Sequence, residues 1–334
     1  MDDLNTGNSE WKKLSPPIPK KDPRRLTDPK SSPDNLKTIP AFTCTNEQLL
    51  RPNIDRDAYL ALELKTPRLN AIHHHLWLAG LPNCARPLHR QKLVGREIFI
   101  TEDPEEHLVW RETRIFIKPL PDFLLDYSYW ENYLCSDEEL HKSACGLLLS
   151  YAWLVRHKSD LRIAKESGLL SGDIEWSSWV EFLQFFLDRL HPSTLDKVNK
   201  RYKYGELRLT RLNEIYRYVP PTYSLNNFVR GFRSGSTWYT AFFERNFKWM
   251  LAVFASISVV LSALQLGLAT DLLKAKVGFQ RASYGFAVAS LVAVVGSAGI
   301  VFVVWFVLFW YYLLSTMAYN KRIEHRRTNN MHSG

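Results

Sequence analysis

The sequence predicts an α+β fold: a helix-dominated cytosolic domain with a small β-hairpin, followed by a C-terminal transmembrane hairpin of two helices. Three observations predict it. Two long apolar runs without a charged residue lie close together after Trp249. Between residues 96 and 118 apolar and polar residues alternate, which is the period of a half-buried strand. Most of the remaining chain between residues 45 and 225 has apolar residues at helical spacing.

Charge and cysteine content limit the class of protein. The chain has 334 residues and a formal net charge of +9, and residues 1–10 are polar without an apolar core, so no signal peptide is expected. Its four cysteines are Cys44, Cys84, Cys135 and Cys145, and none belongs to a Cys-x-x-Cys pair. We therefore expect reduced, buried thiols rather than a disulfide scaffold or a zinc ribbon.

The soluble part divides into an arm and one domain. Seven prolines break any periodic pattern over residues 1–40, so these residues are interpreted as a disordered Pro-rich arm and a candidate segment for binding a protein partner. A compact domain is expected over residues 45–225. Its hairpin should pair residues 96–101 with residues 108–118, across a turn at Asp103-Pro104-Glu105. Helices are expected over residues 55–64, 70–78, 136–157, 160–168, 176–190 and 207–216.

The apolar runs predict two membrane spans. The first covers residues 250–270, which is long enough to cross a hydrocarbon core of about 30 Å. The second covers residues 286–314 and is longer than required, so it should tilt or place its last turns in the interface. An amphipathic juxtamembrane helix over 237–249, a loop over 271–285 and a basic cytosolic tail over 315–334 complete this region.

Small residues recur on both spans, and such ridges let helix backbones approach closely. The predicted membrane-packing residues are Ser258, Ser262, Ala263, Gln265, Gly267, Ala289, Ala293 and Ser297. We expect packing within one hairpin, with homo-oligomerisation as the alternative. Gln265 is the one amide in a span, so it should hydrogen-bond to the partner helix; the sharper alternative is a polar pore lining.

Flanking residues predict how the spans are oriented. Aromatic residues expected at the membrane interface are Trp238, Phe242, Trp249, Trp305, Trp310, Tyr311 and Tyr312. The topology-setting bases are Arg245 and Lys248 before the first span, and Lys321, Arg322, Arg326 and Arg327 after the second. Because cytosolic flanks carry the excess of bases, both termini of this multi-pass integral membrane protein should be cytosolic, although the loop also carries three bases. The organelle is left open.

The sequence contains no recognised catalytic, cofactor-binding or metal-binding motif. His73-His74-His75 is the most metal-like cluster, but three consecutive side chains on a helix point in different directions. Bases are dense between Arg189 and Arg217 without a nucleic-acid module, so contact with an anionic leaflet or a solvated helix face explains them. We therefore expect no cofactor, no metal and no nucleic acid, with the lipid bilayer as a partner and anionic lipid as a further contact.

Four short motifs lie between Leu88 and Leu314. They are HRQKLVGRE at residues 89–97, RIFIKPLP at 114–121, QLGLAT at 265–270 and FQRASYGF at 279–286. These motifs resemble a fungal family of uncharacterised membrane proteins, a domain-of-unknown-function family, and the resemblance implies two C-terminal spans and no assigned activity. The layout also resembles magnesium transporters of the CorA type. Their Gly-Met-Asn signature is Gly267-Leu268-Ala269 here, so their ion site is not carried over.

Three interpretations of function follow. The leading one is a membrane-anchored, non-enzymatic interaction or scaffold protein that faces the cytosol, because a folded domain without a catalytic signature is joined to an exposed Pro-rich arm and an anchor. The second is an oligomeric two-span ion channel or transporter of CorA-like architecture. The third is a membrane-associated enzyme with a scattered site, which a pocket with convergent polar groups would favour.

Overall fold

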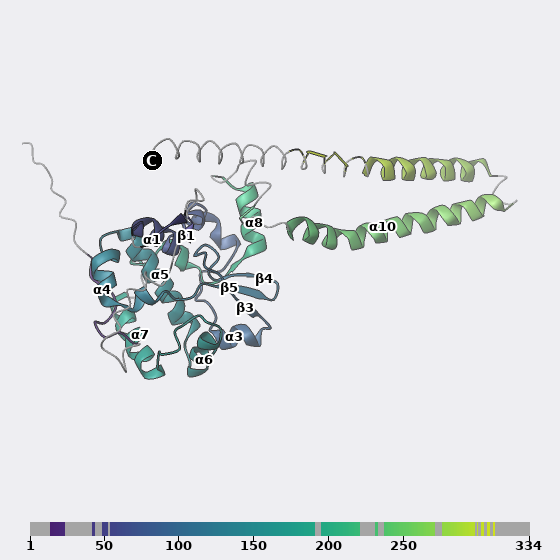
Figure 1. Cartoon of the computed structure of the whole chain (residues 1–334). Helices are drawn as coiled ribbons and strands as arrows, with labels where there is room; N and C mark the ends of the chain where they lie inside the picture. Colours follow the sequence, from purple (N-terminus) through teal and green to yellow (C-terminus); the bar gives the residue numbers. More distant parts are fainter. Residues whose placement is uncertain are drawn as a thin grey trace, which may run out of the picture. The chain divides into compact units, whose positions relative to one another are not determined.

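A computed structural model describes residues 14–23, 42–43, 49–52, 54–190, 195–220, 231–232, 237–270 and 276–297, with residues 299, 302, 303, 306, 307 and 310. The chain divides into two compact units, residues 1–234 and residues 235–334 (Figure 1). The first is helix-dominated with a small mixed sheet, and the second contains two long apolar helices. The predicted fold class is confirmed.

The first unit alternates short helices with very short strands. In chain order its elements are β1 (Phe42–Thr43), β2 (Leu49–Leu50), α1 (Arg56–Leu64), α2 (Pro67–Ala71), η2 (His73–Leu78), α3 (Leu88–Leu93), β3 (Glu97–Ile100), β4 (Val109–Arg111), β5 (Arg114–Ile117), η3 (Asp122–Leu125), α4 (Tyr127–Tyr129), η4 (Trp130–Leu134), α5 (Glu138–Leu154), α6 (Lys158–Glu166), α7 (Trp176–Leu190), η5 (Lys200–Lys203), β6 (Leu207–Arg208) and α8 (Leu209–Tyr218). Here η2, η3 and η5 are 3-10 helices and η4 is one turn of π-helix.

The hairpin is smaller than predicted and has different partners. The expected strand 108–118 is split at Glu112, whose φ of 54° lies in the left-handed region, so that β4 and β5 fold back on each other with Trp110 opposite Ile115. The other expected hairpin strand, β3, instead pairs with β5 in parallel, with Ile98 opposite Ile115. The sheet order is β3-β5-β4-β6. Alternation identified the strands, but it could not reveal the turn inside the second one.

Helix α5 forms the centre of the main core. Its N-cap is Asp137, whose carboxylate accepts hydrogen bonds from the backbone N–H groups of Glu139 (2.8 Å) and Leu140 (3.3 Å). Most of its residues are buried, because α1, α7, η4 and η5 pack around it. Gly146 faces η5 so closely that a Cβ there would lie 2.1 Å from the ring of the buried Tyr202. A glycine is therefore required where α5 meets η5.

Residues 14–23 contradict the prediction of a disordered arm over that stretch. We call them the N-terminal strap. Ile18 is fully buried in the main core, and Pro16, Pro17 and Pro23 are also buried. The strap is ordered because its apolar side chains pack on the domain, and because proline loses little conformational entropy when an extended segment is ordered. The other residues of the predicted arm, 1–13 and 24–40, lie outside the described residues.

The first unit also extends past the predicted boundary at residue 225. Phe232 is buried in a second, smaller core with Leu212, Ile215 and Tyr216 of α8. Its backbone N–H donates to the Asn213 side chain at 2.9 Å. The chain after α8 therefore returns to the domain before the second unit begins.

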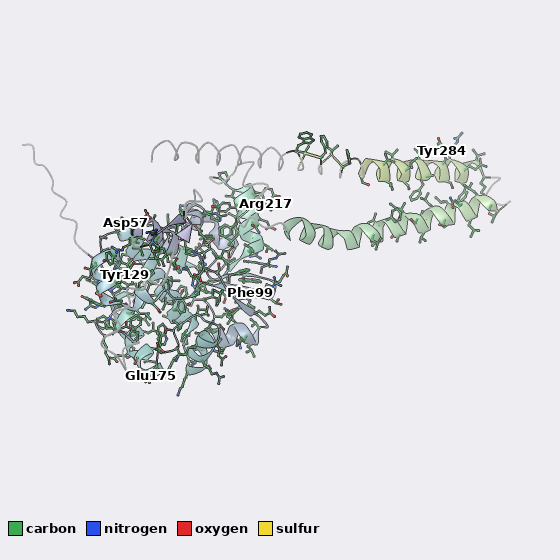
Figure 2. All side chains as sticks on the ribbon, in the orientation of Figure 1. Asp57, Phe99, Tyr129, Glu175, Arg217 and Tyr284 are labelled. Atoms are coloured by element: carbon green, nitrogen blue, oxygen red, sulfur yellow. The ribbon has the colours of Figure 1, made fainter. Side chains whose placement is uncertain are left out.

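In the second unit, the predicted juxtamembrane helix and first span form one continuous helix, α10 (Thr237–Ala269). The second apolar helix begins at Val277, nine residues before the predicted start at Phe286, so residues 277–285 of the predicted loop are helical. Backbone groups near a membrane interface are best satisfied within a helix, which explains why Arg281 does not delay its start. Its Tyr284 is 74% exposed (Figure 2).

Candidate functional site

The candidate site begins with the fixed position of α6. The Asp160 carboxylate is fully buried and accepts from the backbone N–H groups of His89 (2.7 Å), Arg156 (3.1 Å) and His157 (2.9 Å). It is also 2.8 Å from Nδ1 of the His89 ring. Asp160 therefore caps α6 and ties it to the start of α3, so the outer face of α6 is held in one place.

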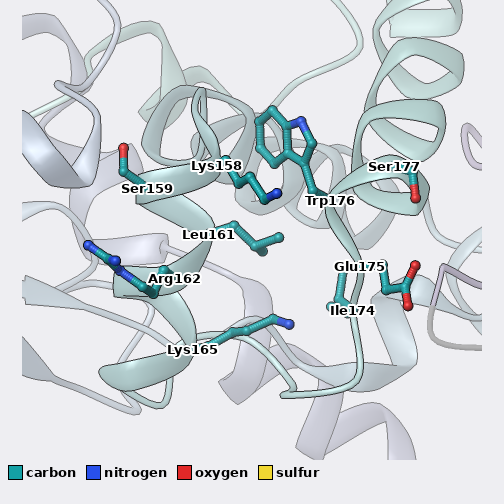
Figure 3. A pocket seen from close by; sticks show the side chains of 9 residues that line it. All are labelled: Lys158, Ser159, Leu161, Arg162, Lys165, Ile174, Glu175, Trp176 and Ser177. Carbon is teal, nitrogen blue, oxygen red and sulfur yellow. The ribbon is translucent and has the colours of Figure 1, made fainter.

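An open depression of about 790 Å³ lies between α6 and the start of α7 (Figure 3). We call it the basic groove. Its lining consists of Lys158, Ser159, Leu161, Arg162, Lys165, Ile174, Glu175, Trp176 and Ser177. Leu161 and Ile174 are buried and form an apolar floor, while Trp176 is half-buried. The lining contains three bases and one acid, so the groove carries a local net charge of +2.

Helical spacing brings the three bases together. Lys158, Arg162 and Lys165 lie at positions i, i+4 and i+7 of α6, which share one face. Arg162 forms a solvent-exposed ion pair with Glu166 at 3.7 Å, and the Lys165 amine donates to the carbonyl of Gly172 at 2.7 Å. Figure 3 shows the Lys158 side chain directed toward the Trp176 ring. Exposed pairs of this kind contribute little stability, so these cations are free to meet an external anion.

The lining offers the chemistry of a binding surface. It combines three bases and one acid with two serines, two aliphatic residues and one indole. An apolar floor, an indole and a cationic rim suit a ligand with negative charge and one apolar side chain.

His107 and Ser150 form the pair closest to a catalytic dyad in the described residues, but its hydrogen bonds run in the wrong direction. The backbone N–H of Lys118 donates to His107 Nδ1 at 3.0 Å, so Nε2 carries the proton and donates to Ser150 Oγ at 2.7 Å. That hydroxyl in turn donates to the Leu147 carbonyl at 2.6 Å. Burial, with the nearby Arg201 and Lys118, holds the pKa of His107 well below its usual range. The pair is a structural bridge in the core.

Lys118 and Cys145 are two further buried ionisable groups. Lys118 is fully buried and forms an ion pair with Glu63 of α1 at 2.7 Å, and its amine donates to the Glu102 carbonyl at 2.7 Å. Cys145 Sγ lies 3.6 Å from His141 Nδ1, but burial raises the pKa of that thiol, which stays protonated. Cys145 is therefore a poor nucleophile.

Two of the eight bases in the predicted cluster between Arg189 and Arg217 are buried. Arg201 is buried, where its guanidinium donates to the carbonyls of His107 (3.0 Å) and Tyr204 (2.6 Å), and burial lowers its pKa to about 10. Arg217 is also buried. These two arginines are unavailable to a lipid surface. The other six bases are exposed: Arg189, Lys197, Lys200, Lys203, Arg208 and Arg211. In the described part of the chain, no three His, Cys, Asp or Glu side chains converge, and His73-His74-His75 lies on η2.

The cysteines differ from expectation at one position. Cys135 and Cys145 are free and buried, as predicted, whereas Cys84 is free and exposed. It lies in the loop between η2 and α3. The Cys44 side chain lies outside the described residues.

The predicted membrane residues are only partly described. Ser258 and Ser262 donate to carbonyls one turn earlier on α10, at 2.9 Å each, and Ser297 donates to Val294 at 2.9 Å, so these hydroxyls are satisfied within their own helices. The packing roles of Ala263, Gln265, Gly267, Ala289 and Ala293 stay predictions. The α10 backbone includes Trp238, Phe242, Arg245, Lys248 and Trp249, but their side chains lie outside the described set, as do Trp305, Tyr311, Tyr312, Lys321, Arg322, Arg326 and Arg327. Trp310 is 44% exposed, with its ring 6.0 Å from Phe306.

Two helices of the second unit are long and apolar enough to cross a membrane: Leu251–Ala269 (19 residues) and Val277–Ser297 (21 residues). By length and composition they suggest a membrane protein.

A comparison with protein families matches residues 56–294 to the family of unknown function DUF6601. The matched range contains the basic groove, α10 and most of the second apolar helix. No curated protein and no solved structure matches the chain.

Proposed function

The chain belongs to the DUF6601 family, whose function is unknown, and we propose that it is a membrane-anchored interaction protein. Its second unit is the anchor, and its first unit binds an acidic segment of a partner protein through the basic groove. The resemblance described above further implies that the family is fungal, which the distribution of its members would test. In the described residues nothing favours the channel or the enzyme interpretation.

The observation that supports anchorage is the exposure of apolar side chains on α10. Between residues 251 and 269, six large apolar side chains are exposed: Leu251, Val253, Phe254, Val259, Val260 and Leu266. Fully burying such a side chain contributes about 1.5–3 kcal/mol, so contact of all six with water costs on the order of 10 kcal/mol. A lipid environment removes that cost without a protein partner.

We propose that both termini face the cytosol and that the connection between the helices faces the opposite side. Arg245 and Lys248 precede the first span, and Lys321 and Arg322 begin the basic tail after the second. The excess of bases outside the hairpin supports this orientation. The small residues on both helices support close packing within the hairpin, which a monomer in mild detergent, measured by light scattering, would bear out.

Topology can be tested with a membrane-impermeant maleimide on sealed microsomes, whose outer face is cytosolic. Cys84 is exposed on the first unit, so it is the built-in control and should be labelled at once. Gly278 is exposed near the start of the second apolar helix, and a Gly278→Cys variant should be labelled there only after permeabilisation. Labelling at position 278 with Cys84 protected would reverse the proposed orientation. Release of the chain by alkaline washing would refute the anchor itself.

The groove can be tested by charge reversal. The double variant Lys158→Glu/Arg162→Glu should weaken binding of a fluorescent peptide of four glutamates around one phenylalanine at least tenfold. The matched control is Lys200→Glu/Lys203→Glu, which changes net charge equally at exposed positions of η5. Equal losses in both variants would show that only overall charge matters, because charges beyond about 10 Å are screened at 0.1 M salt. Trp176→Ala should also weaken binding, because the indole supplies the apolar wall.

A further inference from the structure

A second depression, of about 510 Å³, lies where the N-terminal strap meets α5 and α7. The strap contributes Leu14, Ser15 and Pro17 to its lining, and the helices contribute residues that include His141 and Leu190. We call the surface that receives residues 14–23 the strap seat. The strap thus occupies a site on the folded domain without filling it completely.

One apolar side chain anchors the strap. Ile18 is fully buried in the main core, between prolines at positions 17 and 19. The chain here is neither helix nor strand. Extended proline-rich segments are recognised by other proteins in this way, with apolar side chains in pockets and a backbone that needs little further ordering. The sequence Pro16-Pro17-Ile18-Pro19 has the spacing of such ligands.

Polar contacts at each end give the strap a fixed direction. At its start, the Ser15 carbonyl is 3.4 Å from His141 Nε2. At its other end, the Lys20 amine lies 5.5 Å from the centre of the Tyr127 ring, and the Lys21 amine pairs with Glu181 at 3.3 Å. Both members of the Lys21–Glu181 pair are mostly exposed. The pair therefore contributes more to specificity for the strap sequence than to the affinity of the strap for the domain.

We propose that the strap seat is a recognition site for a proline-rich segment of a partner protein, and that residues 14–23 occupy it in cis. The preferred ligand has two prolines, a branched aliphatic residue, a third proline and two lysines. The strap competes with this ligand, because one site cannot hold both segments. Binding in trans therefore requires release of the strap, which reduces the apparent affinity of the intact chain.

The test uses the full chain in mild detergent and a labelled peptide with the sequence of residues 12–25. An Ile18→Asp chain, whose strap cannot enter the seat, should bind this peptide at least tenfold more tightly than the wild-type chain. The same peptide with Ile18→Asp should not bind. Equal affinity of the wild-type and Ile18→Asp chains for the unmodified peptide, with both folded by near-ultraviolet circular dichroism, would overturn the proposal. The proposal would also be overturned if the wild-type chain formed dimers and the Ile18→Asp chain did not, because two copies would then exchange their straps.

A second measurement keeps the test decisive if Ile18→Asp does not fold. Glu181 is exposed, so Glu181→Lys should leave the fold intact while it loosens the lysine end of the strap. Trypsin should then cut after Lys20 and Lys21 about threefold faster than in the wild-type chain. The reversed pair, Lys21→Glu with Glu181→Lys, should be cut after Lys20 more slowly than Lys21→Glu alone, which has the same acidic residue after the cleaved bond. An unchanged rate in Glu181→Lys, or equal rates in the reversed pair and in Lys21→Glu alone, would show that these contacts do not hold the strap.

Discussion

Raising the pH through the titration of Glu105 should destabilise the first unit. The Glu105 carboxylate is buried and accepts hydrogen bonds from the backbone N–H groups of Arg68 (2.7 Å) and Leu69 (3.0 Å) in the first turn of α2. Burial outweighs these bonds and raises its pKa from 4.5 to about 7. The folded state therefore holds the proton more tightly than the unfolded state, so the contribution of Glu105 to stability is highest below pH 4.5 and falls as the pH rises toward 7.

The magnitude follows from the shift. Each pKa unit corresponds to 1.36 kcal/mol, so the change across this window is about 3 kcal/mol. Because mesophilic domains are stable by about 5–15 kcal/mol, this is a large fraction of the total. The charged form is tolerated because α2 presents its first N–H groups to it.

The assay is urea unfolding of the full chain in mild detergent from pH 4.5 to pH 8. The fluorescence of Trp130 and Trp179, both fully buried, reports on the first unit. A Glu105→Gln variant keeps the shape and an acceptor oxygen but does not titrate. Histidines with lowered pKa, such as His107 and His141, lose stability as the pH falls, but they are present in both proteins and cancel in the difference.

The free energy of unfolding of the wild type, minus that of Glu105→Gln, should fall by about 3 kcal/mol between pH 4.5 and pH 8. A difference that stays constant within about 0.5 kcal/mol would refute the assignment, because mutational differences far from titrating groups are of that size.

Two further changes test the packing. Gly146→Ala should destabilise the first unit by about 1–3 kcal/mol in the same urea assay, because the new Cβ would lie 2.1 Å from the buried Tyr202 ring. Gly172→Ala, where a Cβ meets nothing within 4 Å, is the control and should be neutral or slightly stabilising; similar losses in both would contradict the packing argument. An alkylating reagent should modify the exposed Cys84 in the native chain and leave the buried Cys145 unmodified until the chain unfolds, and mass spectrometry of the labelled peptides checks this.

The fold class follows from the sequence because hydrophobic periodicity reports burial directly. The apolar run of α10 and the helical spacing of α5 and α7 identify these helices, and the prediction was confirmed at this level. The predicted strand pairing was wrong, because the turn at Glu112 depends on a single residue in the left-handed region, which alternation does not reveal. Periodicity also could not show that Ile18, isolated among prolines, belongs to the core.

The candidate site was missed for a different reason. Its signal was present as three bases at i, i+4 and i+7 of a short helix, followed by Trp176. Basic residues are denser in sequence over residues 189–217, so contact with an anionic surface was predicted there. The fold buries Arg201 among backbone carbonyls, and it gathers the three bases of α6 beside an apolar floor and an indole, which density in sequence could not show.

The distance in sequence between the strap and its seat has a consequence for synthesis of the chain. Ile18 leaves the ribosome early, but the main core that it joins includes Phe186 and Leu190 of α7, which are made some 170 residues later. At about 5–20 residues per second, the strap waits roughly 10–30 s for its seat. During that interval a Pro-Pro-Ile-Pro segment with two lysines is open to chaperones and to other nascent chains. Docking of the strap is therefore a late step, which has to wait until α7 has been made.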